Sequence, residues 1–132
     1  MEYNITRKER DCIIALHDNF SFPLRLFNIA ETLKIKAPTA HELIKRLESK
    51  HIIEKKNGII SLTDYGNAVY NDIIMAHRTL EIMLTNSGVN SDMACQQIEK
   101  IDYLMDEVSI QKLFKSMGKP QTCPHGKPVV PK

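Results

Sequence analysis

The stretch APTAHELIKRLESKHIIEKKNGIISLT, residues 37–63, decides the fold. Leu43 and Leu47 recur at helical spacing in its first part and predict the buried face of a helix. In its second part, two β-branched runs flank Asn57-Gly58, and this dipeptide between apolar runs is a strong hairpin signal. A helix that leads directly into a hairpin is typical of the recognition helix and wing of a winged helix-turn-helix protein.

Two further helices are predicted upstream of this stretch. In TRKERDCIIALHDN, Thr6 can cap a helix and Glu9 follows three residues later, as in a capping box. Pro23 prevents this helix from continuing. LRLFNIAETLKI, residues 24–35, then has apolar residues at helical spacing and ends in a short polar linker. The order helix, helix, helix, hairpin predicts a winged helix-turn-helix domain over residues 1–65.

This arrangement predicts DNA binding, because a helix of this length fits the major groove and a basic wing can reach phosphates. Residues near the start of the helix are expected to read bases, and lysines further along are expected to contact the backbone. The alternative is that these charges only solvate the helix and the wing. The predicted base contacts are Lys36, Pro38, Thr39, His41 and Glu42, and the predicted backbone contacts are Lys45, Lys55 and Lys56.

The composition is that of an ordinary globular protein of 132 residues, with 26% charged and 42% hydrophobic residues. Residues 1–65 contain 11 basic and 9 acidic side chains, whereas residues 66–132 contain 7 of each. This small excess is weak evidence for a nucleic-acid partner by itself. No apolar run has membrane-spanning length and the polar start is no signal peptide, so a cytoplasmic protein is expected. The three cysteines are far apart, which argues against a disulfide framework.

The second half predicts an all-helical dimerisation domain over residues 66–132, so that the whole chain is mainly α. TDYGNAVYNDIIMAHRTLEIMLTNSG reads as one long helix that ends at Ser87-Gly88, and two shorter helices follow at roughly 91–105 and 106–117. A heptad-like seam on the long helix, together with the two later helices, is expected to bury a twofold homodimer interface. The symmetry would place two recognition helices about 34 Å apart on a palindromic operator. The seam consists of Val69, Ile73, Ala76, Leu80 and Met83.

The stretch MACQQIEKIDYL, residues 93–104, is open to two interpretations. In a helix, Cys95, Glu99 and Asp102 would share an arc of about 60° beside an apolar stripe of Ile98, Ile101 and Met105. The three polar side chains are then either a solvated flank or one wall of a metal site.

Three segments resemble the DtxR/MntR metal-dependent repressors, and the likeness covers nearly the whole chain. They are NIAETLKIKAPTAHELIKRLESKHIIEKKNGIISLTDYGNAVYNDIIMAHRTLE, IEKIDYLMDEVSIQKL and CPHGKPVVP. In architecture the chain is similar to the short, two-domain type without an SH3-like domain. The resemblance implies a homodimeric repressor in which a divalent metal bridges the two domains and promotes operator binding.

The resemblance also implies a ligand set, and the residue types at those positions bear on the choice of ion. Carboxylates with imidazole suit Mn²⁺ or Fe²⁺, whereas added thiolates shift the preference towards Fe²⁺, Co²⁺ or Zn²⁺. The implied ligands of one ion are Glu9, Cys12, His77, Glu99 and Asp102, with Glu81 one turn after His77 and Cys95 in the position of a second, ancillary site.

Two features leave the site open. Tyr103 stands where the family has a histidine, and a phenol is a poorer ligand than imidazole. The alternative function is therefore a winged-helix regulator that has lost metal control and is constitutive or thiol-sensing. Cys123 and His125 could add a ligand pair, although Pro124 beside them favours a shaped turn.

We find no nucleophile paired with a base and no phosphate loop, so an enzyme is not expected.

Overall fold

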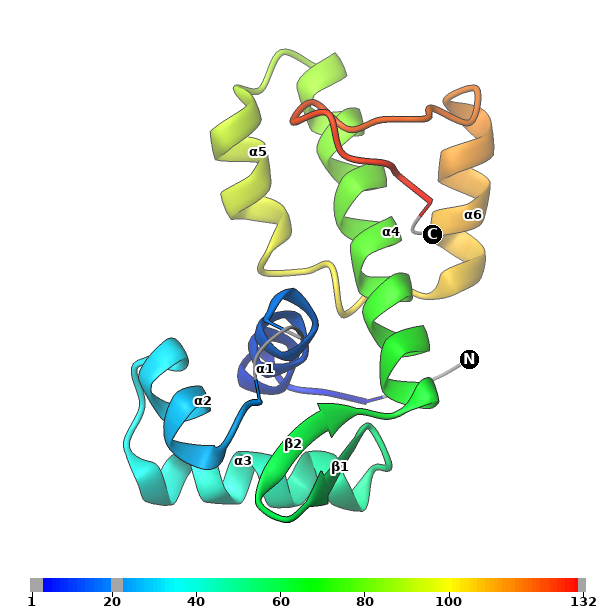
Figure 1. The fold of residues 1–132 in the computed structure, drawn as a ribbon. Helices are drawn as coiled ribbons and strands as arrows, with labels where there is room; N and C mark the ends of the chain where they lie inside the picture. Colours follow the sequence, from blue (N-terminus) through cyan, green and yellow to red (C-terminus); the bar gives the residue numbers. More distant parts are fainter. Residues whose placement is uncertain (1–3, 20–22, 131–132) are drawn as a thin grey trace. The chain divides into compact units, whose positions relative to one another are not determined.

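The computed structural model describes residues 4–19 and 23–130 (Figure 1). The chain forms two compact units, one comprising residues 4–70 and the other beginning at residue 71. The helix α4 (Asp64–Asn86) starts in the first unit and continues into the second. None of the helices in the described part of the chain combines the length and the apolar character needed to cross a membrane.

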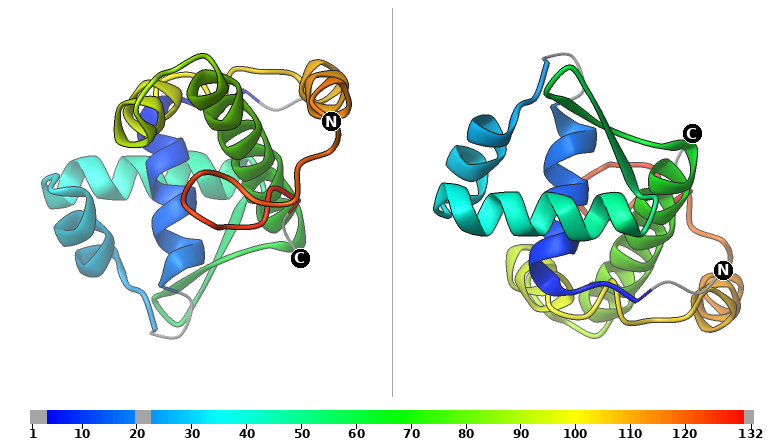
Figure 2. Two further views of the ribbon diagram at one scale, coloured as in Figure 1. Left: turned by 90° about the horizontal axis from the view of Figure 1, so that it is seen from above. Right: turned by 90° about the horizontal axis from the view of Figure 1, so that it is seen from below.

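The amino-terminal unit is a winged helix-turn-helix, as predicted. It consists of α1 (Arg7–Asp18), α2 (Leu26–Leu33), α3 (Ala37–Ser49), β1 (Ile53–Lys56) and β2 (Ile59–Leu62). The predicted capping box is present at the start of α1. Thr6 Oγ1 accepts from the Glu9 backbone N–H at 3.2 Å, and Glu9 Oε1 accepts from the Thr6 N–H at 3.1 Å. In Figure 2, the view from below shows α3 crossing α1 on the outside of this unit.

The wing turns at Asn57-Gly58, which confirms the predicted hairpin. Both residues have positive φ angles, 51° and 77°, and β1 pairs with β2 in antiparallel register on either side of them. Leu24 adds a bridge to Ile60, and the Arg25 guanidinium donates to the Asn57 carbonyl at 3.0 Å. The wing is therefore held at its edge and at its tip by the segment that precedes α2.

A close backbone approach connects the wing to α4. Thr63 Oγ1 donates to the His51 carbonyl at 2.6 Å, and the Thr63 N–H donates to the Ile52 carbonyl at 3.0 Å. The Gly66 N–H in turn donates to Thr63 Oγ1 at 3.0 Å. A Cβ atom on Gly66 would lie 2.1 Å from the Ile52 carbonyl oxygen. Only glycine fits there, so this residue fixes the point at which α4 leaves the wing.

The carboxyl-terminal unit packs α5 (Ser91–Ile98), α6 (Glu107–Ser116) and a final loop against α4. As predicted, α4 ends before Gly88, which has a φ of 99°, and the Val89 N–H donates back to the Leu84 carbonyl. Two clusters of buried residues lie in the described part of this unit. One contains Ala76, Leu80, Ile98 and Ile110, and the other contains Ile82, Phe114, Cys123 and Val129.

The prediction that the helix after residue 91 extends to about 105 is wrong, because α5 ends at Ile98. Tight turns follow, in which the N–H of Ile101 and that of Asp102 both donate to the Ile98 carbonyl. These turns bring Asp102 inward, where it is 1% exposed, and leave Ile101 40% exposed and Met105 37% exposed. The predicted apolar stripe therefore does not form.

The seam of α4 is also not a free surface for a second chain. Ala76 and Leu80 pack against α5 and α6 of the same chain, and Val69 and Ile73 are fully buried. Exposed large apolar side chains lie elsewhere, and most of those in the carboxyl-terminal unit belong to the turns after α5 and the first turn of α6. Four of them, Ile101, Leu104, Met105 and Val108, form what we call the 101–108 patch, and Phe27, Met93 and Val130 are exposed singly in other segments.

Candidate metal centre

Three side chains of types that can bind a metal ion, from α4 and α5, meet in the carboxyl-terminal unit. His77 and Glu81 lie one turn apart on α4, and His77 Nε2 is 3.2 Å from Glu81 Oε2. Cys95 Sγ on α5 lies 3.4 Å from the same imidazole nitrogen. One ligand atom of each residue lies within 4.8 Å of the others. Imidazole, thiol and carboxylate converge on one point, which fits a divalent transition metal.

Asp102 contacts His77 on the ring nitrogen that faces away from Glu81 and Cys95. Its Oδ2 lies 2.9 Å from His77 Nδ1, whereas the other imidazole nitrogen faces Glu81 and Cys95. A buried carboxylate on the far nitrogen fixes the orientation and tautomer of a ligating histidine and increases its basicity. Glu99 lies at the edge, with Oε1 4.0 Å from Cys95 Sγ. In this geometry Asp102 orients His77, and the ligand role implied for Asp102 and Glu99 stays a prediction.

We expect Asp102→Asn to weaken metal binding by about 10- to 100-fold, because an amide orients the imidazole less firmly and does not increase its basicity. Titration calorimetry with Mn²⁺ and Co²⁺ measures this loss. The variant should keep its melting temperature in the absence of metal within a few degrees of the unmodified chain. An unchanged affinity would show that Asp102 does not act on His77.

A second group of ligand side chains shares Glu81 with the first. His125 Nδ1 lies 2.9 Å from Glu81 Oε1, and Cys123 brings its thiol within 4.8 Å of the ligand atoms of both residues. The sequence Cys-Pro-His-Gly forms a tight turn in which the Gly126 N–H donates to the Cys123 carbonyl at 2.8 Å. Pro124 at the second position and glycine at the fourth suit such a turn. The predicted shaped turn therefore exists, and it also brings both side chains to α4.

Asp92 supports His125 as Asp102 supports His77, with its Oδ1 3.4 Å from His125 Nε2. The hydrogen bonds to Glu81 and to Asp92 raise the pKa of His125 above its ordinary value. A metal ligand must be a neutral imidazole, so protons compete with a metal ion for this residue. Each oxygen of Glu81 thus faces one histidine, which is in turn held by another carboxylate.

Glu9 and Cys12, the implied ligands on α1, belong to the amino-terminal unit. Glu9 Oε2 lies 2.8 Å from Lys50 Nζ. The Lys50 side chain, at the end of α3, is 37% exposed, whereas that of Glu9 is buried. Burial, with smaller effects from Glu9 and Asp11, raises the pKa of the Cys12 thiol to about 12. Their ligand role stays a prediction.

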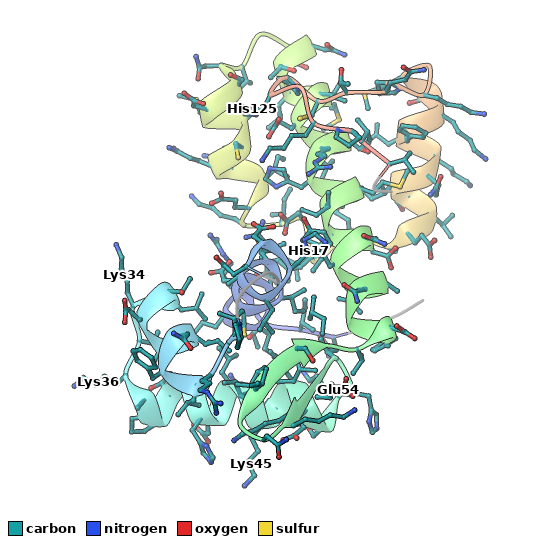
Figure 3. All side chains as sticks on the ribbon, in the orientation of Figure 1. His17, Lys34, Lys36, Lys45, Glu54 and His125 are labelled. Atoms are coloured by element: carbon teal, nitrogen blue, oxygen red, sulfur yellow. The ribbon has the colours of Figure 1, made fainter. Side chains whose placement is uncertain are left out.

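The predicted DNA contacts all lie on exposed parts of the amino-terminal unit. Figure 3 shows Lys36 projecting outward at the start of α3 and Lys45 projecting outward from further along the same helix, with Lys34 near Lys36 at the end of α2. The others are also exposed, namely Pro38, Thr39, His41 and Glu42 on α3, and Lys55 and Lys56 on the wing.

The sequence interpretation missed two partners of the candidate ligands. Asp92 was not considered beside His125, and Lys50 was not considered beside Glu9. No local pattern reports either pair, because 33 and 41 residues separate the partners. The spacing of Cys123 and His125 did carry a signal, since two ligand residues flank a proline in a turn.

Comparison with known proteins identifies the family. Residues 63–131 match the family model described as "Iron dependent repressor, metal binding and dimerisation domain". A hypothetical protein from Sulfolobus solfataricus is 32% identical, with a TM-score of 0.86, and the match covers 97% of this chain and 100% of that one. The manganese regulator SloR shares the fold, with a TM-score of 0.80 at 23% identity over 97% of this chain and 61% of its own.

A curated relative from Aeropyrum pernix is described as an uncharacterised HTH-type transcriptional regulator. It is 27% identical over 108 residues, which cover 81% of this chain. The match spans 60% of the length of that relative.

A winged helix-turn-helix followed by a helical metal-binding and dimerisation domain defines a class of metal-dependent transcriptional regulators. The family model covers more than half of this chain, and the chain therefore belongs to the iron-dependent repressor family.

Proposed function

We propose that this protein is a homodimeric repressor whose binding to a palindromic DNA operator is promoted by a divalent metal ion. The observation that carries the proposal is the convergence of His77, Glu81 and Cys95 in the unit that matches the metal-binding domain of the family. The exposed helix α3 supplies the DNA-reading part.

The proposed ligands are the two groups that share Glu81. His77 and Cys95 complete the first group, and Cys123 and His125 complete the second. A bound ion supplies a divalent positive charge that these donors can surround. Fe²⁺ and Mn²⁺ are the proposed physiological ions, since the family is described as iron dependent and SloR is a manganese regulator. The two thiols also suit Zn²⁺ and Co²⁺.

We propose that the 101–108 patch forms the dimer interface in place of the buried α4 seam. Leu104 is 65% exposed and Val108 is 63% exposed, although both are large and apolar. Contiguous exposed apolar side chains of this kind mark interaction surfaces. A second copy of the chain is the proposed partner, because the family model describes this region as a dimerisation domain.

Linkage connects the metal to DNA binding. A ligand that binds only one arrangement of a protein stabilises it by about 2.7 kcal/mol at 100 times its dissociation constant, which is close to a 100-fold change in an equilibrium. His77, Glu81 and Cys95 need only be better placed in the DNA-competent dimer for metal to act as co-repressor.

Binding to DNA from the protein's own promoter region, with and without Mn²⁺ or Fe²⁺ under anaerobic conditions, tests this function. Footprints should appear or strengthen with metal. Replacing Thr39 and His41 by Ala should relax the preference for particular bases. Replacing Lys55 and Lys56 by Ala should weaken binding to all DNA sequences alike and reduce the salt dependence of the affinity.

Two results would contradict this assignment. If the wing variant changed base preference and the helix variant did not, α3 would not be the reading element. If the footprint were the same with and without metal while calorimetry showed no binding, the alternative of a constitutive or thiol-sensing regulator would replace metal control. The half-buried Cys95 thiol beside His77 would be the first candidate for such sensing.

A further inference from the structure

Glu9 is a fully buried carboxylate on α1, and Lys50 compensates its charge. Lys50 Nζ lies 3.0 Å from Glu9 Oε1 and 2.8 Å from Oε2. Oε1 also accepts the capping hydrogen bond from the Thr6 N–H at 3.1 Å. Both carboxylate oxygens are therefore engaged by donors of the amino-terminal unit, and the positive end of the α1 dipole lies beside them.

The Lys50 ammonium group has an acceptor for each of its three protons. Besides the two oxygens of Glu9, its ammonium group donates to the Asn4 carbonyl at 2.8 Å, and an ammonium group has three protons to donate. Lys50 follows the last turn of α3, so this contact connects the end of α3 to the start of α1. The Glu9 side chain is only 1% exposed, so its carboxylate is shielded from water and salt, whereas the Lys50 side chain is 37% exposed.

A divalent ion at Glu9 would have to displace this ammonium group. Lys50 would then lose two of its three acceptors and remain beside a second positive charge. The Glu81 carboxylate differs from that of Glu9 because its hydrogen-bond partners are two histidines, His77 and His125. In the described part of the chain, no lysine or arginine nitrogen lies within 4.0 Å of the Glu81 oxygens. Histidines can release a proton and become ligands, whereas a lysine keeps its charge.

We propose that Lys50 is a permanent, built-in counter-cation of Glu9, and that Glu9 therefore takes no part in metal binding. The metal is then held by the carboxyl-terminal unit without a ligand from this position. This proposal rests on the proposed function only for the existence of that metal. The consequence for regulation is that α1 and α3 are fixed to each other with or without metal, so the DNA-reading unit is preformed.

Melting curves of the full, metal-free chain test the ion pair. Lys50→Met should lower the melting temperature by roughly 10 °C, because it leaves the buried Glu9 carboxylate uncompensated. Glu9→Gln should lower it by less, because the Lys50 side chain is 37% exposed and water can solvate its charge. The double variant should recover most of the loss in Lys50→Met, since both charges are removed together. Lys8→Met, which removes an exposed lysine next to Glu9, is the control and should change little. Single variants that melt like the unmodified chain, or losses that simply add in the double variant, would overturn the proposal.

Calorimetric titration with Mn²⁺ and Co²⁺ tests the separation from the metal. Glu9→Gln should bind the same number of ions as the unmodified chain, with an affinity that differs by no more than about threefold. This change is smaller than the loss expected on removing a group that only orients a ligand. If Glu9→Gln is poorly folded, the double variant takes its place. His77→Ala should lose binding in the same experiment. The loss of one ion in Glu9→Gln would overturn the proposal. If the unmodified chain bound no metal, the proposed function would fail, and the melting cycle would still decide the role of Lys50.

Discussion

Glu81→Gln is expected to abolish metal-stimulated DNA binding, with the affinity for Mn²⁺ and Co²⁺ falling by more than about 100-fold. One carboxylate oxygen faces His77 and the other faces His125, so this substitution removes the shared member of both ligand groups. An amide carries no charge to balance a divalent ion. Titration calorimetry and fluorescence anisotropy with labelled operator DNA measure the two losses.

Asp72→Asn is the matched control, because it removes a carboxylate from α4 itself at a half-buried position outside both ligand groups. It should bind metal and DNA like the unmodified chain. Circular dichroism should show that Glu81→Gln remains helical. Metal activation that survives in a folded Glu81→Gln variant would exclude both ligand groups as we have described them.

Replacing Leu104 and Val108 together by Glu should convert the dimer to a monomer at micromolar concentration. Two charges per chain would be buried in an apolar interface, and unpaired buried charges are strongly unfavourable. DNA affinity should fall by at least about 100-fold, because a monomer reads one half-site and loses the gain from linked binding. Sedimentation equilibrium and operator titration provide the measurements.

Val130→Glu tests whether the effect is specific to the 101–108 patch. Val130 is also apolar and 51% exposed in the carboxyl-terminal unit, so the substitution adds a charge at a comparable surface position. This variant should remain dimeric. A dimer that persists in the Leu104 and Val108 double variant would place the interface elsewhere.

The amino-terminal unit could be predicted from sequence because local rules determine its elements. The capping box at Thr6, the helical spacing of α3 and the Asn57-Gly58 turn each involve residues within a few positions of one another. The long α4 was predictable for the same reason, since its periodicity continues until Gly88. Local consistency of this kind needs no knowledge of the tertiary structure.

The end of α5 could not be predicted in the same way. The helical pattern of the sequence continues past Ile98. The chain nevertheless leaves the helix there, and this path is stabilised by the hydrogen bond between Asp102 and His77, 25 residues away. The α4 seam was misassigned for a related reason. An apolar stripe shows that a helix is covered and does not show whether its own chain or a second chain covers it.

The candidate metal centre was partly predictable. The resemblance pointed to His77, Glu81 and Cys95, which the structure brings together. It gave no indication that Lys50 faces Glu9, because that pair depends on how the end of α3 meets the start of α1. Long-range electrostatic partners of this kind are set by the packed fold and have no signature in sequence spacing.

The continuity of α4 determines how the protein can be divided into pieces. The two compact units separate after Tyr70, in the middle of a helix, so no loop exists there to cut. A fragment that began at residue 71 would have an uncapped helix N-terminus, whose first N–H groups would lack hydrogen-bond partners within the helix. Thr63 is the natural starting point, since its side chain accepts from Gly66 at the first turn, and the family match also begins at residue 63. The transferable module for recombination or engineering is therefore longer than the compact unit, by the first two turns of α4.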